Sequence, residues 1–286
     1  MQRPIRLIAI DIDGTLLNSK VQLSDENRDA LRRAHQAGIE IVLGTGRRHD
    51  FAMPIAASLG FDLWLLSSNG AVTRSTRGET FHCDFLPKAT AIKLALALRK
   101  YRNYMVLTFD RPGIGAIVCE NHDQLYGVIQ RWMEKNARFI EYVSPIEHAL
   151  TEDPVQAMVC GPVELMGLAQ QDLAALDFCQ DFTALRTQYD FRDLCIVDLL
   201  NAGCSKGHAL ERWATHRGFD RSEVMAIGDN YNDVEMLTFA GHPVIMGNAC
   251  DELKRNGWTV TLHHDEHGVA AIIEQVLESN AAIVNA

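Results

Sequence analysis

The chain has 286 residues and a mass of 31.9 kDa, which is enough for a substantial core and for two domains of ordinary size. Hydrophobic residues make up 47% and charged residues 22% of the chain, which excludes a disordered protein, a fibrous repeat and a coiled coil. The formal charge of −10 at pH 7 repels polyanions, so we do not expect nucleic acid as a partner.

The seven cysteines are scattered along the chain, and no two of them form a Cys-x-x-Cys pair. This pattern indicates neither a disulfide framework nor a zinc knuckle, and it favours a reducing compartment. Residues 1–10 lack the apolar length of a signal peptide, and nowhere do about 18 apolar residues follow one another as in a membrane span. The sequence therefore predicts a cytoplasmic protein that does not enter a membrane.

The N-terminal part of the chain alternates between strand and helix patterns. Residues 5–10 are apolar and β-branched, as in a strand buried in the middle of a parallel sheet. Ser24 is the expected N-cap of a helix that ends at Gly38. The next predicted elements are a strand at 39–43, a helix at 48–59 and a strand at 63–66. With right-handed crossovers, this order predicts an α/β fold with a doubly wound parallel sheet.

From about residue 81 the predicted strands come in pairs, with helices beside them. The helices are expected at 88–100, 122–136 and 162–176, and the strands at 104–109, 115–120, 155–160 and twice within 182–200. This grouping indicates a separate α+β domain. After Gly203 the alternation returns, with helices at 206–217, 233–239 and 269–278 and strands at 224–227 and 243–246. We therefore expect a first domain of residues 1–82 and 196–286, with residues 83–195 inserted into it.

Polar residues follow the predicted strands of the first domain. Reactive groups in an open parallel sheet gather at the carboxyl ends of its strands, so we expect these residues at one edge. Clustered carboxylates repel one another unless a hard cation is present, and Mg²⁺ that also contacts a substrate phosphate suits such a cluster. A hydroxyl, loop amides and an ammonium would offset the remaining phosphate charge. The residues concerned are Asp11, Asp13, Thr45, Gly46, Asn69, Lys206, Asp229, Asn232 and Asp233.

Four motifs occur in a recognisable order. Asp11-Ile12-Asp13-Gly14-Thr15 is followed by Gly44-Thr45-Gly46-Arg47, by Lys206-Gly207 and by the run 228–233. This order resembles that of the haloacid dehalogenase-like phosphohydrolases. The long insertion and the segments 246–249 and 268–270 are similar to the Cof-type subgroup, which carries a large α/β cap. The resemblance implies a Rossmann-like catalytic core, with residues 83–195 as a cap domain that determines substrate specificity.

The resemblance also implies roles for single residues. Asp11 would be the nucleophile that forms an aspartyl phosphate, and Asp13 would be the general acid and base. Mg²⁺ would be bound by Asp11, Asp13 and Asp229 with support from Asp233, for which capping of the next helix is an equal alternative. Thr45, Gly46, Lys206 and Asn232 would bind the phosphate, and Arg47 and Asn69 would lie near the substrate. We interpret His263, His264 and His267 as part of a solvated loop rather than as a metal site.

These residues predict a Mg²⁺-dependent phosphatase of a small phosphorylated metabolite, such as a sugar phosphate, a nucleotide or a phosphorylated cofactor. A phosphomutase or phosphotransferase that uses the same aspartate is one alternative, and a non-catalytic protein that binds a phosphorylated metabolite is another. A signalling receiver domain is excluded, because such domains are much shorter and lack the Asp-x-Asp-Gly-Thr spacing. The sequence identifies neither the substrate nor the cap residues that bind it, and it does not indicate the oligomeric state.

Overall fold

The computed structural model describes residues 3–121 and 123–284. The chain divides into a first unit, Met1–Cys83 with Ser205–Ala286, and a second unit, Asp84–Cys204. The protein is thus an α/β protein whose doubly wound first domain carries an inserted domain. The expected end of the insertion at residue 195 falls inside strand β11 (Leu194–Asn201), which pairs with a neighbour on each side. The division comes after Cys204 because this strand continues the second sheet without a break.

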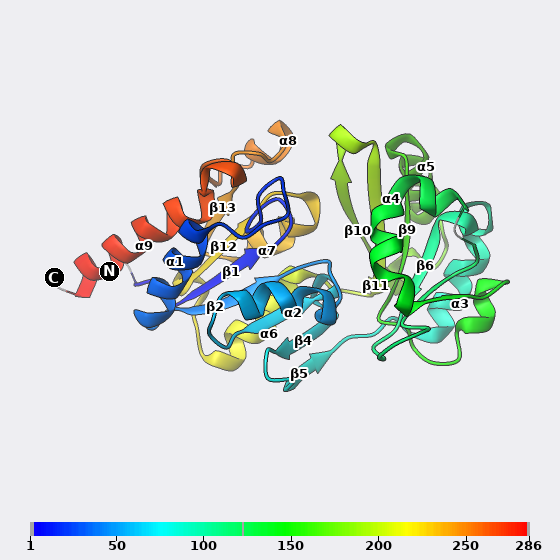
Figure 1. Ribbon diagram of the computed structural model, residues 1–286, viewed down its shortest axis with the longest axis horizontal. Coiled ribbons are helices and arrows are strands. Elements are labelled where there is room, and N and C mark those ends of the chain that lie inside the picture. Colours follow the sequence, from blue (N-terminus) through cyan, green and yellow to red (C-terminus); the bar gives the residue numbers. More distant parts are fainter. Residues whose placement is uncertain (1–2, 122, 285–286) are drawn as a thin grey trace. The chain divides into compact units, whose positions relative to one another are not determined.

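The first unit contains an eight-stranded sheet in the order β14-β13-β12-β1-β2-β3-β4-β5 (Figure 1). Strand β1 lies in its middle and pairs in parallel with β2 and β12, while β4 and β5 form an antiparallel edge. Every residue of β1 is buried, as expected for a strand with helices on both faces. The strands are β1 (Leu7–Asp11), β2 (Glu40–Gly44), β3 (Trp64–Ser67), β4 (Val72–Ser75), β5 (Thr80–Cys83), β12 (Val224–Gly228), β13 (His242–Ile245) and β14 (Thr259–Val260).

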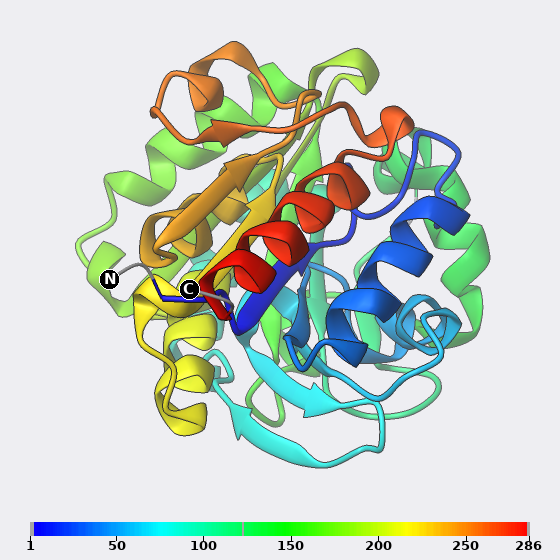
Figure 2. The ribbon, with the colours of Figure 1, turned by 90° about the vertical axis from the view of Figure 1, so that its left-hand side faces the viewer.

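Helices cover both faces of this sheet because alternate residues of β1 point to opposite sides. Ile8 and Ile10 pack into one apolar cluster with α1, α2 and α9, while Leu7 and Ala9 join a second cluster with α6 and α7. Figure 2 shows α9 (red) beside α1 (blue), and the two helices are in contact. The helices are α1 (Asp25–Gln36), α2 (His49–Ser58), α6 (Lys206–Arg217), α7 (Val234–Phe239), α8 (Asp251–Lys254) and α9 (Gly268–Val284).

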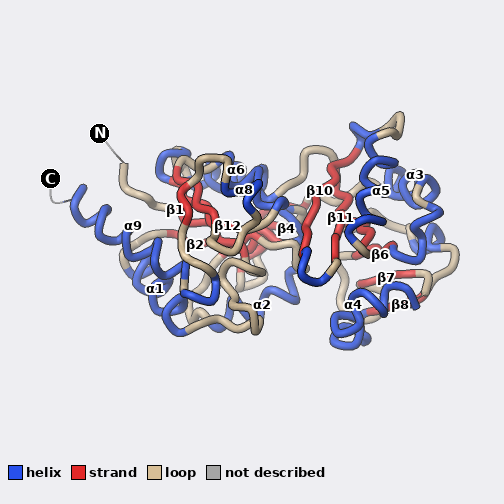
Figure 3. Tube along the Cα trace, turned by 90° about the horizontal axis from the view of Figure 1, so that it is seen from above, coloured by secondary structure: helices blue, strands red, loops and turns tan. Residues whose placement is uncertain are grey.

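The second unit contains a six-stranded sheet in the order β10-β11-β9-β6-β7-β8, drawn in red in Figure 3. Its neighbouring strands are antiparallel except for β7 and β8. One face of the sheet packs against α3 and α5 to form the core of this unit. The elements are α3 (Lys88–Ala97), β6 (Met105–Thr108), β7 (Ile117–Cys119), α4 (Asp123–Asn136), β8 (Ile140–Tyr142), β9 (Gln156–Gly161), α5 (Val163–Ala174), β10 (Phe182–Tyr189) and β11.

Five short elements have no counterpart in the sequence-based prediction: β4, β5, β8, β14 and α8. Each has only two to four residues, and none of them contains an apolar run like those of the short strands that were predicted, such as β3 and β6. The expected helix at 88–100 ends earlier, at Ala97, and continues as a 3-10 segment. Within the described part of the chain, none of the helices has the length and apolar character needed to cross a membrane.

Candidate active site

Three aspartates from two strand ends meet in the first unit. Asp11 is the last residue of β1, and Asp229 and Asp233 follow β12, the parallel neighbour of β1. One carboxylate oxygen of each lies within 4.8 Å of the others. All three side chains are buried, with Asp233 fully inaccessible to solvent. The sheet topology therefore gathers the carboxylates that the sequence placed at strand ends.

Lys206 is the cation of this cluster. Its Nζ donates to Asp11 Oδ1 at 2.6 Å and to Asp233 Oδ1 at 2.7 Å, and its side chain is fully buried. Lys206 is the first residue of α6, and the hydroxyl of the N-cap Ser205 accepts a hydrogen bond from the His208 amide. The cap ends the preceding loop at a defined residue, so the ammonium enters the cluster from the start of a rigid helix.

The negative charges of the three aspartates exceed the single positive charge of Lys206. Burial, followed by the charge of Asp233, raises the pKa of the Asp11 carboxyl well above its ordinary range. Burial and the charges of Asp11 and Asp233 also raise the pKa of Asp229. Burial by itself lowers the pKa of Lys206, but Asp11 and Asp233 outweigh burial, and the pKa rises. Three carboxylates beside one ammonium leave two negative charges, so the residues fit a divalent cation with oxygen ligands.

Asp229 is held by the loop that follows β1. Thr15 Oγ1 donates to Asp229 Oδ1 at 3.1 Å, and Asn248 Nδ2 lies 3.4 Å from Asp229 Oδ2. Asn248 Nδ2 also donates to the Gly14 carbonyl at 2.7 Å, while its Oδ1 accepts from the His264 amide at 3.0 Å. Gly14 has a φ of +83°, and a Cβ there would lie 2.3 Å from Asp229 Oδ2. Only glycine fits this position.

Asp233 is fully engaged within the protein. Its Oδ1 accepts from Lys206, and its Oδ2 accepts from the amides of Asp229 and Asn230 at 3.0 and 3.1 Å. These bonds tie the loop after β12 to the start of α6. The geometry therefore favours a supporting role for Asp233, while Asp11 and Asp229 offer the carboxylate oxygens for a cation.

Four residues expected around the phosphate and substrate, Thr45, Gly46, Asn69 and Asn232, lie together. Asn69, which is fully buried, has a left-handed backbone with a φ of 52°. Its amide donates to the Thr45 carbonyl at 2.9 Å, and its Oδ1 accepts from Asn232 Nδ2 at 3.0 Å. A Cβ on Gly46 would lie 3.4 Å from the Asn69 side chain. The loops after β2, β3 and β12 are thus joined through Asn69.

Asp13 stands apart from the three clustered aspartates. Its carboxylate is held by Arg47, whose Nε lies 2.6 Å from Oδ2 and whose Nη2 lies 2.5 Å from Oδ1. The side chains of Asp13 and Arg47 are 35% and 23% exposed, so this pair is more open to solvent than Asp11, whose side chain is 7% exposed. Arg47 thus contacts Asp13 directly, and its expected place near the substrate stays a prediction.

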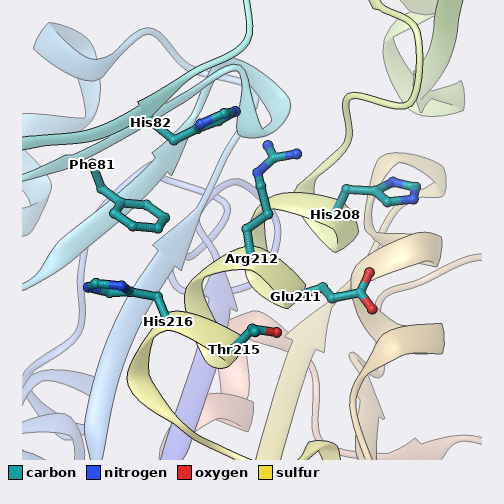
Figure 4. Close-up of a pocket in the computed structure, with 7 residues that line it drawn as sticks. All are labelled: Phe81, His82, His208, Glu211, Arg212, Thr215 and His216. Carbon is teal, nitrogen blue, oxygen red and sulfur yellow. The ribbon is translucent and has the colours of Figure 1, made fainter.

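Two other features of the first unit contain no residue of this cluster. A cavity of about 460 Å³ lies between β5 and α6, with His82, His208 and Arg212 among its lining (Figure 4). None of the residues predicted for the site is among the described residues that line it. His263 and His264 also approach Asp265, but the His263 ring accepts the Asp265 amide as a helix cap. That hydrogen bond gives the His263 ring a structural partner, and the interpretation of a solvated loop stays a prediction.

Two residues of the site have no role in the sequence-based prediction. Thr15 is fully buried and bonds Asp229, although it was quoted only as part of a motif. Asn248 was quoted only within the segment 246–249, yet it connects Gly14, Asp229 and the loop at His264. Both residues contact the loop that follows β1 or the loop that follows β12. These contacts could be found from the sequence only if β1 and β12 were known to be neighbours in the sheet.

Comparisons with known proteins agree with this geometry. The profile of the haloacid dehalogenase-like hydrolases matches residues 8–273. The phosphatase YwpJ of Bacillus subtilis is 34% identical, with 96% of this chain and 100% of that protein aligned. The pyridoxal phosphate phosphatase YbhA of Escherichia coli is 30% identical over 87% of this chain and 90% of that protein.

Solved structures show the same fold along nearly the whole chain. A haloacid dehalogenase-like hydrolase from Bacillus subtilis has a TM-score of 0.79 and 30% sequence identity, covering 94% of this chain and 99% of its own. A haloacid dehalogenase-like hydrolase from Bacteroides thetaiotaomicron has a TM-score of 0.77 at 30% identity, covering 95% and 99%. With the Asp11 cluster at the strand ends of a doubly wound sheet and a profile match over most of its length, the chain belongs to the haloacid dehalogenase-like hydrolases.

Proposed function

We propose that the protein is a Mg²⁺-dependent phosphatase that hydrolyses a small phosphorylated metabolite through an aspartyl phosphate on Asp11. The observation that carries the proposal is the buried cluster of Asp11, Asp229 and Asp233 around Lys206 at the carboxyl edge of the first sheet. Relatives named as phosphatases, one for pyridoxal phosphate and one for HMP-PP, support a phosphate ester of a small metabolite as the substrate class.

The proposed reaction has two steps. In the first, a carboxylate oxygen of Asp11 attacks phosphorus and the ester P–O bond breaks, while Asp13 donates a proton to the leaving oxygen. In the second, Asp13 takes a proton from water, whose oxygen attacks the phosphorus of the aspartyl phosphate and releases inorganic phosphate. Asp11 is thereby regenerated as a carboxylate. Arg47 keeps the Asp13 carboxylate in one orientation for both proton transfers.

The phosphate would be bound by groups from several loops. Lys206 supplies the ammonium, and Thr45, Gly46 and Asn232 supply a hydroxyl, a backbone amide and a side-chain amide. Mg²⁺, when bound, supplies positive charge that offsets the charge of the phosphate during the displacement. Asp11 and Asp229 would hold it together with the Asp13 carbonyl, and Asp233 would support the arrangement from its bonds to Lys206 and the loop amides.

The inserted unit is proposed as the cap that selects the leaving group and excludes bulk water during turnover. Its described residues form a six-stranded sheet with helices α3, α4 and α5, and the Asp11 cluster belongs to the first unit alone. A cytoplasmic location is part of the same proposal, in keeping with the described cysteines, none of which forms a disulfide.

The test is release of inorganic phosphate from p-nitrophenyl phosphate and from a panel of phosphorylated metabolites, with Mg²⁺ or with EDTA. Asp11→Asn is nearly isosteric and removes the nucleophile, so we expect a loss of about a thousand-fold or more in kcat without loss of the fold. Asp62→Asn, a change of an exposed aspartate bonded to Arg77, is the matched control and should keep full activity.

Four results would contradict the proposal. Release that does not depend on Mg²⁺ would remove the cation from the mechanism. Near wild-type turnover by Asp11→Asn would remove the nucleophile. Transfer of the phosphoryl group to an added alcohol that exceeds its transfer to water would identify a phosphotransferase, and absence of release by folded protein would favour a binding protein.

A further inference from the structure

A cavity of about 460 Å³ lies within the first unit, between β5 and α6 (Figure 4). We call it the α6 cavity. None of the three clustered aspartates is among the described residues that line it. Its volume falls in the range of roughly 300–1,000 Å³ that is usual for pockets that bind small organic molecules. Its lining includes Phe81 and His82 of β5 and His208, Arg212, Thr215 and His216 of α6.

One wall of the α6 cavity is aromatic. The rings of Phe81 and His216 have centroids 4.6 Å apart and are inclined by 39°. Phe81 also contacts the ring of Trp213 edge-on at 5.2 Å, and Trp213 is only 2% exposed. Phe81 itself is half-buried, so its ring is held by the buried indole and remains open to a ligand. Such a wall suits a planar aromatic ring.

Basic side chains line the α6 cavity along one face of the helix. His208, Arg212 and His216 follow one another at intervals of four residues, so they share this face. Glu211 is the one carboxylate in the described lining, and in Figure 4 it points away from Phe81 and His216. The chain as a whole carries a formal charge of −10, so these basic residues oppose its overall charge. The cavity therefore favours a ligand with a negative group.

We propose that the α6 cavity is an effector site for a small aromatic carboxylate. The ring of the ligand would pack against Phe81 and His216, and its carboxylate would accept hydrogen bonds from the Arg212 guanidinium. A cationic ligand is disfavoured by the charge of Arg212, and an aliphatic acid would leave the aromatic wall unused. An aromatic phosphate ester would itself be a substrate of the proposed phosphatase, so the stable anionic group is a carboxylate.

The α6 cavity is connected to Lys206 through the N-terminal cap of α6. His208 Nδ1 lies 3.0 Å from Oγ of the N-cap Ser205, and the same Oγ accepts a hydrogen bond from the His208 amide at 3.2 Å. Lys206 follows Ser205 directly, and its Nζ contacts Asp11 and Asp233. A ligand that contacts His208 is therefore one hydrogen bond away from the residue that caps the helix of Lys206.

A bound carboxylate would strengthen this cap. His208 is exposed and its Nδ1 faces Ser205, so Nε2 is the ring nitrogen left for a ligand that also contacts Arg212 one helical turn away. A carboxylate at Nε2 favours the imidazole form that carries hydrogen there, in which Nδ1 accepts the proton of the Ser205 hydroxyl. Ser205 then donates to the ring while it accepts from the amide. We expect Lys206 to be held more rigidly and to bind a phosphate more tightly as a result.

The first experiment measures binding, which does not depend on the proposed function. The probe is 1-naphthoate, and 1-naphthamide is its neutral analogue. Isothermal titration calorimetry in EDTA gives Kd for the full-length wild type, Arg212→Gln and Arg217→Gln. Arg217 is the matched control, because it belongs to the same helix, bonds Glu40 and is not among the described residues that line the cavity.

We expect the wild type and Arg217→Gln to bind 1-naphthoate with the same Kd. Arg212→Gln should raise Kd about ten-fold or more, and 1-naphthamide should bind the wild type more weakly by about the same factor, because each change removes a charge-assisted hydrogen bond. Absence of binding, equal Kd values for the wild type and Arg212→Gln, or equal binding of 1-naphthamide would overturn the inference. Displacement of 1-naphthoate by inorganic phosphate with Mg²⁺ would place the probe in the catalytic site and overturn it as well.

The second experiment measures the coupling to Lys206, which rests on the proposed function. Saturating 1-naphthoate should lower KM for p-nitrophenyl phosphate about five-fold, and by reciprocity inorganic phosphate with Mg²⁺ should lower the Kd of 1-naphthoate by a similar factor. Ser205→Ala should still bind 1-naphthoate in EDTA but should lose both effects. An unchanged or higher KM of the wild type, or the same fall in Ser205→Ala, would overturn the effector role. Failure of the wild type to hydrolyse p-nitrophenyl phosphate would instead contradict the proposed function, and calorimetry would still decide whether the cavity binds the probe.

Discussion

Arg47 holds both oxygens of the Asp13 carboxylate, through Nε at 2.6 Å and Nη2 at 2.5 Å. Only a guanidinium presents two parallel N–H groups in this way. The pair forms because Asp11 and Gly44 are register partners on β1 and β2, so that the loops after the two strands meet. The residue proposed to move the proton is thus oriented by the same loop that supplies Thr45.

Arg47→Lys should lower kcat about ten-fold or more and leave KM nearly unchanged, because an ammonium cannot orient both oxygens of Asp13 during proton transfer. Stability should change by no more than about 1 kcal/mol, since both side chains reach solvent. The measurement is steady-state hydrolysis of p-nitrophenyl phosphate. Arg77→Lys, which alters the exposed Arg77 pair with Asp62, is the control. An unchanged kcat would show that Arg47 does not position Asp13.

Lys206→Met should destabilise the protein by about 3–5 kcal/mol in EDTA, because Asp11 and Asp233 would lose their buried cationic partner. Mg²⁺ should restore part of this loss by supplying positive charge to the same carboxylates. Urea unfolding with and without Mg²⁺ measures both effects. Lys100→Met, at an exposed lysine that pairs with Asp172, should cost less than about 1 kcal/mol. Equal stabilities of the two variants would contradict the assigned electrostatics.

Asn248→Ala should raise the Mg²⁺ concentration needed for half-saturation roughly ten-fold, because outer partners of a metal ligand hold it in its binding orientation. The lost contacts are those of Nδ2 with the Gly14 carbonyl and with Asp229. The Mg²⁺-dependent rise in unfolding temperature reports this affinity without relying on turnover. Asn256→Ala, which removes a bond to the Leu253 carbonyl, should respond to Mg²⁺ like the wild type. The same response from Asn248→Ala would exclude a positioning role.

The thiols should differ sharply in reactivity. Burial raises the pKa of Cys119 and Cys195 to about 11 and that of Cys160 to about 12, so at pH 8 at most about one thiol in a thousand of each is ionised. Cys83 and Cys179 are exposed. Iodoacetamide at pH 8 should therefore label these two first in the native protein, as read by mass spectrometry. Unfolded protein provides the control, and rapid native labelling of Cys160 would contradict the burial of β9.

Long periodic elements could be predicted from the sequence because their apolar residues recur at the spacing of the element. Helix α6 begins and ends where it was expected, between the cap Ser205 and Gly218 in a left-handed backbone. The carboxylates could be placed at one edge because parallel strands end together. The hairpin of β4 and β5 could not be predicted, because Thr73, Arg74 and Ser75 show no hydrophobic pattern. Their strand conformation depends on their pairing with β3.

Contacts between individual residues of the site could not be predicted from the sequence. Whether Arg47 meets Asp13 or the substrate depends on the register of β1 with β2, and a shift of one residue would separate them. Asn248 meets Gly14 only because β13 follows β12 in the sheet next to β1. The end of the inserted unit could not be predicted either, because β11 continues through residue 195 as one strand.

The strand order of the first unit also bears on how the chain folds as it is synthesised. β1 lies between β2 and β12, so its second edge stays unpaired until residues 224–228 have been made. The inserted unit is continuous in the chain and contains every strand of its own sheet. During synthesis the inserted unit can therefore fold before β12 is available to pair with β1. Until then one edge of β1 stays unpaired. A released chain truncated after residue 223 should accordingly need a chaperone to protect β1, although its inserted unit is complete.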